Sequence, residues 1–427
     1  MAMLYLLAGL VLFALVGIPL AFSIGASCVA YLAADAPFLL INLPQKIWGG
    51  AYSQLMIAMP MFMLAGELMN SGGITKRIID MCLYFVRPIR GGLGEVNVVA
   101  SMIFGGISGS SVADTSALGS ILIPSMEKMG YPPKVAAGIT VASSTMGMII
   151  PPSIPMIIFA MVSGASVGGL FMAGTIPGLL IGVSQTVLVY IISRKNGYHP
   201  PRTPFDKRDF AKTMLVGLPA MLMPVFIVVT VSFGVCTATE SAGLAVLYAL
   251  VVGILLYREL KWKHILTALR KTFIASATIM IIIGFTNIFT WILTMRQVPL
   301  QVAAFFNGLS LPSWVILLIL DLLILFIGTF IDVSPAILLL APILLPVMQN
   351  LGVSTLQFGA ILITGMAIGL VTPPVGMCLN ACSRINKMPV TEIFAGAAPY
   401  ILCNVFVLII ITLIPELTTW LPSVLGY

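Results

Sequence analysis

A long apolar segment occurs twice in this chain, and glycines and prolines interrupt both copies at equivalent positions. The residues from Gly106 to Pro152 align without gaps to those from Gly328 to Pro374, at a constant offset of 222 positions. Ten aligned positions are identical, and six of these ten are Gly or Pro. Because Gly and Pro weaken or break helices, the pattern predicts backbone breaks at matching places in two related halves. Such paired interruptions are typical of secondary transporters whose binding site lies at the repeat interface.

The composition places these breaks inside a membrane. The chain has 427 residues, of which 59% are hydrophobic and 8% charged, and its mean hydropathy is +1.11. Soluble domains carry about 25% charged residues, so we expect an all-α polytopic membrane protein. The net charge of +7 then indicates basic cytoplasmic loops rather than a nucleic-acid partner. We expect the six cysteines to be small buried side chains, without disulfides or a metal site.

Hydropathy and basic residues together predict nine membrane crossings. The apolar run 3–34 is too long for a cleaved signal and is interpreted as a retained first helix. Basic residues mark interfacial segments at 74–90 and 258–271 and a cytoplasmic loop at 194–213. A segment at 297–309 resembles the first interfacial one. This orientation puts the N-terminus in the cytoplasm and the C-terminus outside. The predicted crossings are 3–34, 50–70, 134–163, 168–193, 214–232, 238–257, 272–294, 355–383 and 398–418.

Two further segments predict re-entrant hairpins on opposite sides of the membrane. Between Glu95 and Met126, the Gly-Ser run 105–111 leaves arms too short to cross a core of ~30 Å at ~1.5 Å per residue. Lys128 and Lys134 place the closing turn of this hairpin in the cytoplasm. The second hairpin, 313–349, closes through an uncharged turn and is assigned to the other side. The predicted fold is an inverted-topology repeat with two re-entrant helical hairpins and two broken transmembrane helices.

This reading divides the chain into five parts. Two of them are transport repeats, each with a hairpin and a broken helix, and the others are scaffold. We predict N-terminal scaffold helices and an interfacial arm at 1–94, the first transport repeat at 95–167, scaffold helices with a loop and arms at 168–312, the second transport repeat at 313–388, and a C-terminal helix at 389–427.

Broken helices supply free backbone groups for ligands within the membrane. Carbonyl and hydroxyl oxygens suit a hard cation such as Na⁺, whereas the N-termini of half-helices favour an anion. Each copy can build one cation site, from 105–111 against 147–152 and from 328–332 against 369–374. Enough polar side chains lie between these segments to bind one small solute: Ser110, Ser111, Asp114, Ser143, Ser144, Thr145, Ser153, Asp332 and Asn380.

Structural roles compete with these functional ones. Gly and Ser in membrane helices commonly serve close packing, and Asp332 can cap the helix that begins near Pro335. Asp114 and Asp332 are nevertheless acids within the membrane, for which a functional role is the default. Arg296 is predicted on the external side, where its side chain can either contact an anion or anchor the helix at the membrane interface.

Two other functions fit parts of the sequence. Gly106-Ile-Ser-Gly109 matches the G-x-S-G motif of intramembrane serine proteases, which need a base beside the serine. Both histidines, His199 and His264, lie in basic loops, so this sequence offers such a serine no intramembrane histidine. A channel is the second alternative, against which the repeat with broken helices favours alternating access.

These motifs together resemble the large membrane subunit of tripartite ATP-independent periplasmic (TRAP) transporters. The resemblance rests on Gly105–Asp114, on Gly147 with Pro151-Pro152, on Thr237–Ala242, and on the run from Leu340 to Gly376, and it covers nearly the whole chain. The family often has Thr-Pro-Thr-Glu where this chain has Thr-Ala-Thr-Glu at 237–240. We expect no functional loss, because the groups of this capping box remain.

The resemblance implies an Na⁺-coupled importer of a carboxylate in the bacterial inner membrane, working by an elevator movement. It implies at least two Na⁺ ions and no organic cofactor. It also implies a small four-helix membrane subunit and a periplasmic substrate-binding protein as partners. The chain holds no equivalent of the small subunit, so we expect a heterodimer. The best-fitting solute is a sialic acid such as N-acetylneuraminate, with a C4-dicarboxylate or another sugar acid as alternatives.

The resemblance also assigns residues. Ser108, Gly147, Ile150 and Pro152 would offer oxygens to one Na⁺. Gly328, Gly369 and Thr372, with Asp332, would serve the other. Ser110, Ser111, Asp114 and Asp332 would face the solute, and the predicted substrate set is completed by Ser144, Thr145, Ser153, Arg296 and Asn380.

Overall fold

In the computed structural model, the regular secondary structure is helical in the part of the chain that is described, which is all residues except 1, 54, 87–91, 199–206 and 310. The helices before the chain midpoint are α1 (Ala2–Leu15), α2 (Leu20–Asp35), a 3₁₀ helix (Pro37–Asn42), α3 (Leu43–Ala51), α4 (Leu55–Ser71), α5 (Ile74–Val86), α6 (Gly92–Ser108), α7 (Ser111–Lys128), α8 (Pro133–Ser144), α9 (Met146–Ile149), α10 (Ile154–Ser163) and α11 (Val167–Asn196). The remaining ones are α12 (Lys207–Ser232), α13 (Ala238–Val251) with a π-helical turn (Val252–Leu256), α14 (Trp262–Met295), α15 (Val298–Gly308), α16 (Ser313–Gly328), α17 (Val333–Asn350), α18 (Thr355–Gly369), α19 (Met377–Asn386), α20 (Val390–Leu413) and α21 (Glu416–Val424).

The repeat found in the sequence recurs in the order and length of the helices. Adding 222 to the bounds of α7 gives the bounds of α17. The same offset carries α5, α6 and α10 onto α15, α16 and α19, to within two residues at each end. It also carries the pair α3–α4 onto the single long helix α14. The duplication therefore extends well beyond the aligned segment, and the two halves of the chain build equivalent elements.

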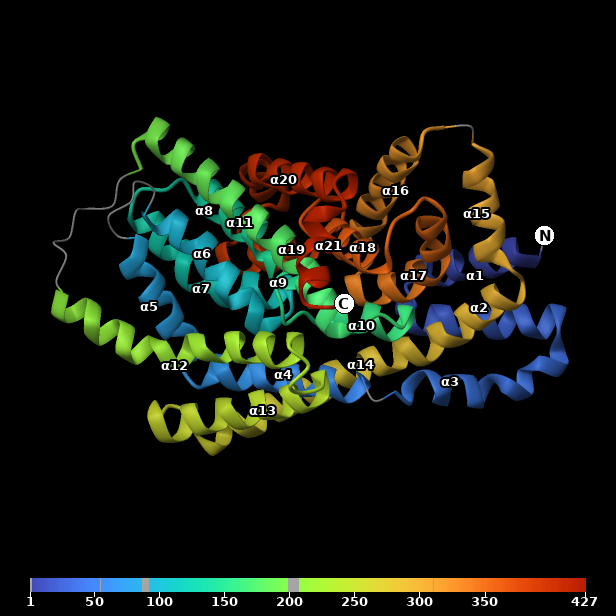
Figure 1. Ribbon diagram of the computed structural model, residues 1–427, viewed down its shortest axis with the longest axis horizontal. Helices are drawn as coiled ribbons and strands as arrows, with labels where there is room; N and C mark the ends of the chain where they lie inside the picture. The colour runs from blue at the N-terminus through green and yellow to red at the C-terminus, as the bar shows by residue number, and fades with distance from the viewer. Residues whose placement is uncertain (1, 54, 87–91, 199–206, 310) are drawn as a thin grey trace.

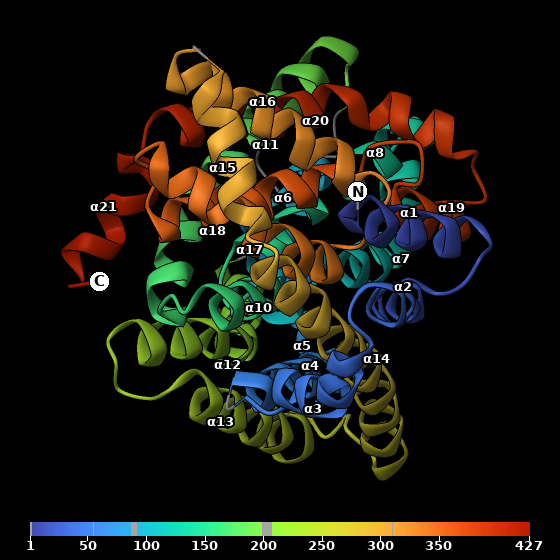
Figure 2. The same cartoon turned by 90° about the vertical axis from the view of Figure 1, so that its right-hand side faces the viewer.

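Two groups of helices lie on opposite sides of the molecule. Figures 1 and 2 show α3, α4, α12, α13 and α14 together along one side, with the hairpins and broken helices on the other. Within the first group, which we call the scaffold layer, α4 packs against α13 and α14 packs against α3 and α4. In the second group, α10 of the first copy packs on α17 of the second, and α19 of the second copy packs on α7 of the first. The two copies are thus interlocked through the second halves of their broken helices.

The predicted first helix, 3–34, is wrong as a single element. The chain turns at Gly17, whose φ is +92°, and α2 starts after Pro19. Helices α1 and α2 then pack against each other. A left-handed glycine followed closely by a proline ends one helix and starts another, and this local signal overrides the continuous hydropathy.

The predicted interfacial helix 258–271 and the crossing 272–294 are also wrong as separate elements, because they form one helix, α14. Lys261 precedes this helix, and its backbone N–H donates to the Nδ1 atom of His264 at 3.3 Å. The sequence has no proline between Trp262 and Met295, so the change from basic to apolar composition does not interrupt the backbone.

Other boundaries differ by one or two turns. In the first hairpin, α6 continues to Ser108, so the break is confined to Gly109 and Ser110. Helix α20 begins at Val390, ahead of the predicted 398. Within the predicted loop 194–213, α12 begins at Lys207, whereas 199–206 lie outside the described residues, as do 87–90 of the predicted arm 74–90.

Within the described residues, seven helices are long and apolar enough to cross a membrane, or eight when α3 and α4 count as one span. Nine crossings were predicted, of which 3–34 and 355–383 are divided into shorter helices here. One of the seven long helices, α17, was instead predicted as an arm of the second hairpin. The apolar side chains of Leu179, Val183, Val187 and Ile191 form an exposed stripe along α11. This stripe, repeated at helical spacing, suits contact with lipid or with another membrane protein.

Candidate functional site

The tip of the first hairpin is a glycine-serine turn. Gly109 has a φ of +61°, and a Cβ at this position would lie 3.0 Å from the Cγ1 atom of Ile154. Ser110 has an extended backbone and caps α7, because its hydroxyl accepts from the N–H of Ala113 at 3.5 Å. The turn therefore needs both residue types, one for its backbone conformation and the other for the new helix.

Asp114, in the first turn of α7, is the buried charge of this tip. Its side chain is fully buried, and the Ser108 hydroxyl donates to its Oδ1 atom. Its Oδ2 atom has no hydrogen-bond partner among the described residues. A Cβ on Gly147 would collide with this carboxylate, so only glycine fits there. Burying a carboxylate oxygen without a hydrogen-bond partner costs free energy, and such an oxygen is a suitable ligand for a hard cation.

The break between α9 and α10 lies directly against this tip. A Cβ on Gly105 would lie 2.8 Å from the Cα of Gly147, so the two backbones touch. Ile150 is extended, the Pro151-Pro152 peptide bond is cis, and Ser153 caps α10 by accepting from the N–H of Met156 at 3.4 Å. The Ser153 hydroxyl also donates to the carbonyl of Met148. The structure thus brings Ser108, Gly147, Ile150, Pro152 and Ser153 close to the tip of the first hairpin.

The second copy repeats this arrangement, but its acidic residue, Asp332, stands at the helix cap and not in the first turn of the helix. Asp332 occupies the position equivalent to Ser110 and caps α17, with its Oδ1 atom accepting from the N–H of Val333 at 2.8 Å. A Cβ on Gly328 would lie 3.1 Å from the Cα of Gly369. The Thr372 hydroxyl donates to the carbonyl of Ile368 at 2.8 Å, and the Pro373-Pro374 bond is cis. Asp332 therefore acts as a helix cap while its carboxylate stands at the tip of the second hairpin.

The two copies meet around Cys378 on α19. Cys378 is buried, and α19 packs against α7 and α8 of the first copy. The Thr115 hydroxyl donates to the Ser144 hydroxyl at 2.8 Å. Ser144 on α8 is thus hydrogen-bonded to α7 of the first hairpin.

Two other predicted substrate residues, Thr145 and Arg296, have structural partners. Thr145 accepts from the amide of Asn404 at 3.1 Å, and Asn404 in turn accepts from Gln185 at 2.7 Å, all three being buried. Arg296, at the end of α14, forms an ion pair with Asp35 and donates to the Tyr31 hydroxyl. These contacts hold Thr145 within a buried polar network. They hold Arg296 against α2, away from the hairpin tips.

Asn380 and Ser111 differ in exposure. Asn380 is exposed on α19 and donates to the carbonyl of Val375 at 2.5 Å. Ser111 is fully buried, and its hydroxyl has no hydrogen-bond partner in the described part of the chain. Of the two, Ser111 is therefore the residue with free hydrogen-bonding capacity beside the tip.

A cavity of about 370 Å³ opens beside the first tip. Ser108 and Ser110 line it from the hairpin, and Glu67 and Lys271 line it from the scaffold layer. The Lys271 ammonium lies 3.0 Å from the Glu67 carboxylate. We call this space the tip cavity. Its lining includes hydroxyl groups and a lysine, which are suitable partners for a carboxylate-bearing solute.

Two buried acids were not selected from the sequence. Glu95 on α6 has neither carboxylate oxygen hydrogen-bonded to the described residues and interacts with Tyr131 and Tyr400. Asp321 on α16 is buried near Thr412. Both were detectable in principle, since an acid within an apolar run is unusual in a membrane helix.

Known proteins resemble this chain along most of its length. Residues 5–417 match the family described as "Tripartite ATP-independent periplasmic transporter, DctM component". The sialic acid TRAP transporter large permease protein SiaM of Vibrio cholerae is 36% identical over 413 residues, which cover 96% of each protein. The C4-dicarboxylate TRAP transporter large permease protein DctM of Pseudomonas aeruginosa is 35% identical over 404 residues, covering 95% of this chain and 94% of that protein.

The fold also resembles that of a solved transporter. The crystal structure of the Alcanivorax borkumensis YdaH transporter superimposes with a TM-score of 0.66 and covers 97% of this chain and 98% of its own. The two sequences are 17% identical, so this likeness concerns the fold alone.

Proposed function

This chain belongs to the DctM family of tripartite ATP-independent periplasmic transporters, and we propose that it imports a small organic carboxylate together with Na⁺. As a member of this family it is a multi-pass membrane protein and the large subunit of a secondary transporter, not an enzyme. In the described residues, the protease alternative also finds no histidine beside Ser108, because that hydroxyl donates to Asp114 and His264 lies at the start of α14. The second histidine, His199, is outside the described residues.

The observation that carries the Na⁺ proposal is the buried Asp114 carboxylate. One of its oxygens accepts from Ser108, while the other faces Gly147 without a hydrogen bond from the described residues. An Na⁺ ion bound here would neutralise the carboxylate, which otherwise carries the full cost of its burial. We assign this ion to Asp114, the Ser108 hydroxyl and the backbone at Gly147, Ile150 and Pro152.

We assign a second Na⁺ to the equivalent break in the other copy. Gly328 and Gly369 are in backbone contact there, and Thr372 and Asp332 provide side-chain oxygens on either side. Because α10 packs on α17 and α19 packs on α7, each site rests against a helix of the opposite copy. Filling one site would therefore order elements that the other site uses.

The solute would bind between the two tips. Helices α7, α10, α17 and α19 all begin at these breaks, and the N-terminus of a helix favours an anion. Ser110, Ser111, Ser144 and Ser153 supply hydroxyl groups around the same region. In this account the two Na⁺ ions offset the charges of Asp114 and Asp332, so that the anionic solute binds after them. Na⁺ supplies this neutralisation, and the chain supplies orientation and selectivity.

We further propose an elevator movement in the bacterial inner membrane, with the N-terminus cytoplasmic and the C-terminus periplasmic. The hairpins and broken helices would move as a block along the scaffold layer, carrying the assembled site from one side to the other. The partners would be a small four-helix membrane subunit and a periplasmic binding protein. The membership in a family named for a tripartite system supports these partners.

The best candidate solute is N-acetylneuraminate, with a C4-dicarboxylate as the alternative. The named solutes of two similar relatives are sialic acid and C4-dicarboxylates, at 36% and 35% identity. The test is uptake of labelled N-acetylneuraminate and labelled succinate into proteoliposomes that hold this chain and its small subunit, with the matching binding protein outside. Uptake of N-acetylneuraminate alone would support the proposed solute. Uptake of succinate alone would replace it and keep the transport mechanism.

A further inference from the structure

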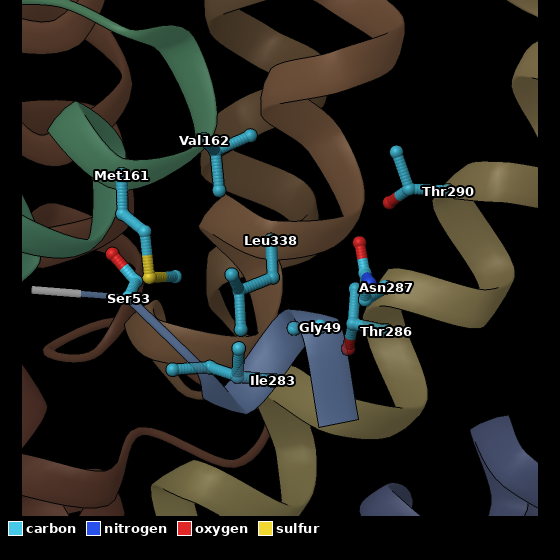
Figure 3. A pocket seen from close by; sticks show the side chains of 10 residues that line it. Gly49, Ser53, Met161, Val162, Ile283, Thr286, Asn287, Thr290 and Leu338 are labelled. Carbon is cyan, nitrogen blue, oxygen red and sulfur yellow. The ribbon is translucent and has the colours of Figure 1, made fainter. Parts of the chain in front are cut away.

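A second cavity lies beside the scaffold layer, away from the first hairpin tip. It has a volume of about 260 Å³ and is shown in Figure 3. Figure 3 shows Ile283 of α14 below Leu338, with Ser53 on one side of them and Asn287 on the other. We call it the Asn287 cavity, and its lining residues are Gly49, Gly50, Ser53, Met161, Val162, Ile283, Thr286, Asn287, Thr290 and Leu338.

The internal repeat relates this space to the tip cavity. Lys271, Thr272 and Ala275 line the tip cavity, and they are equivalent to Gly49, Gly50 and Ser53 of the Asn287 cavity at the offset of 222. A second scaffold helix lines each cavity with four residues at the same spacing, α4 in the tip cavity and α14 in the Asn287 cavity, but at an offset of 220 positions rather than 222. These four are Met63, Gly66, Glu67 and Asn70 in the tip cavity, and Ile283, Thr286, Asn287 and Thr290 in the Asn287 cavity.

Both cavities open on one face of α14, at two heights. Thr272 lines the tip cavity, and Thr286 lies 14 positions further along the helix in the Asn287 cavity. Fourteen residues make nearly four turns and span about 20 Å, so the two threonines share a face. Both are buried, and neither hydroxyl has a hydrogen-bond partner among the described residues. Helix α14 thus presents two unpaired hydroxyl groups to the hairpin side, one in each cavity.

The two cavities differ in what faces them from the hairpins. The tip cavity is lined by Ser108 and Ser110, which belong to the first hairpin tip. The equivalents of these residues are Phe330 and Asp332, and they do not line the Asn287 cavity, which α17 reaches through Leu338. The repeat is therefore used unequally in this structure: the first tip lines its cavity, whereas the second copy lines the Asn287 cavity beyond its tip, at Leu338 on α17.

The chemistry of the Asn287 cavity is polar without charge. Ser53, Thr286 and Thr290 bring hydroxyl groups, and none of the ten lining residues is ionisable. Asn287 uses its amide nitrogen to bind the carbonyl of Lys46 at 2.7 Å, which leaves its amide oxygen as an acceptor. Such a wall recognises hydroxyl and amide groups of a ligand and offers no counter-ion to a carboxylate.

We propose that the Asn287 cavity is the second docking position of the solute, where the scaffold layer binds its uncharged hydroxyl-bearing part. The carboxylate would stay with the hairpin tips, which move past α14 by about the spacing of the two threonines. This inference rests on the proposed function and deepens it, because it selects sugar acids over C4-dicarboxylates. A dicarboxylate would put a second charge against a wall without a cation.

Thr286→Val tests this inference with little risk to folding. The substitution keeps the shape of the side chain and removes a buried hydroxyl that is unpaired in the described structure, so the folded protein should be as stable or slightly more stable. We expect the KM for N-acetylneuraminate uptake to rise about ten-fold, the equivalent of one lost hydrogen bond. The matched control is Thr278→Val on the same helix, where the exposed hydroxyl bonds only the carbonyl of Ile274 in the described structure.

Both measurements use the complete reconstituted system. Wild-type uptake of N-acetylneuraminate or succinate tests the proposed function itself, independently of any variant. A raised KM for Thr286→Val with a normal KM for Thr278→Val supports the inference. Wild-type kinetics in the Thr286→Val protein would overturn it, as would a wild-type protein that accepts succinate and rejects N-acetylneuraminate.

A thiol at position 53 provides a second readout that does not depend on turnover. In Ser53→Cys, a membrane-impermeant methanethiosulfonate reagent should label the cavity thiol, measured as the excess over wild-type labelling. N-acetylneuraminate with Na⁺ should slow this labelling several-fold, because the solute would fill the cavity. Labelling that proceeds at the same rate with and without the transported acid would contradict a docking position here.

Discussion

Gly328 lies so close to Gly369 that a Cβ on Gly328 would come within 3.1 Å of the Gly369 Cα. The same relationship joins Gly105 to Gly147 in the first copy, at 2.8 Å. In both copies the end of a hairpin arm touches the end of a half-helix through two glycines. The close approach brings backbone carbonyl groups of two breaks together, which is what a site built from backbone oxygens requires.

Gly328→Ala should separate these two segments. The added methyl group has backbone on its far side, so relief requires movement of a helix end and should cost about 1–3 kcal/mol of stability. We expect Na⁺-dependent uptake to fall at least ten-fold, measured together with the melting temperature of the purified protein. Gly243→Ala is the matched control, because a Cβ at that helical position meets no atom within 4 Å. Normal uptake by Gly328→Ala would show that the close contact is dispensable.

Asp332→Asn should weaken transport while leaving the fold intact. Asparagine caps helices about as well as aspartate, so the start of α17 is preserved. The lost charge should lower uptake about ten-fold or more, as expected for a ligand contact made by a charged group. Thermal unfolding of the variant is the control. Unchanged uptake would remove Asp332 from the site.

Asp114→Asn should weaken uptake at low Na⁺ concentrations, because Asp114 is a proposed Na⁺ ligand. The amide cannot replace the carboxylate as a cation ligand, and we expect the Na⁺ concentration for half-maximal uptake to rise at least ten-fold. Glu127→Gln, an exposed acid near the end of the same helix, should leave this value unchanged. A Na⁺ titration of initial uptake rates distinguishes the two variants. Equal Na⁺ dependence in both would exclude Asp114 as an ion ligand.

Thr145→Val separates a structural role from a substrate contact. The Thr145 hydroxyl accepts from Asn404 within the buried network, so its loss should cost about 1–3 kcal/mol and lower the melting temperature. The KM for the solute should stay at the wild-type value in the fraction that folds. A raised KM with an unchanged melting temperature would return Thr145 to the substrate set.

The sequence predicted the breaks because their cause is local. Gly109 and the Pro151-Pro152 pair act through backbone conformation, which a single chain displays directly. The same holds for the caps, since Ser110 and Asp332 stand where a new helix must begin. These residues defined both halves of the candidate site before any packing was known.

What the sequence could not provide is packing between distant segments. Nothing local indicates that Thr145 faces Asn404, or that Thr115 bonds to Ser144. The interlocking of α10 with α17 and of α19 with α7 depends on the same long-range contacts. Charge patterning also misled at α14, where cations at the start of a helix were interpreted as a separate interfacial segment.

We propose that Na⁺ binding at the two breaks drives solute uptake. This is tested by the initial rate of N-acetylneuraminate and succinate uptake into proteoliposomes, with the small subunit and binding protein present, with and without an inward Na⁺ gradient. We predict that one of these acids accumulates only under the gradient, and that replacing Na⁺ with K⁺ abolishes its accumulation. Equal accumulation with and without Na⁺ would contradict the coupling and, with it, both cation sites.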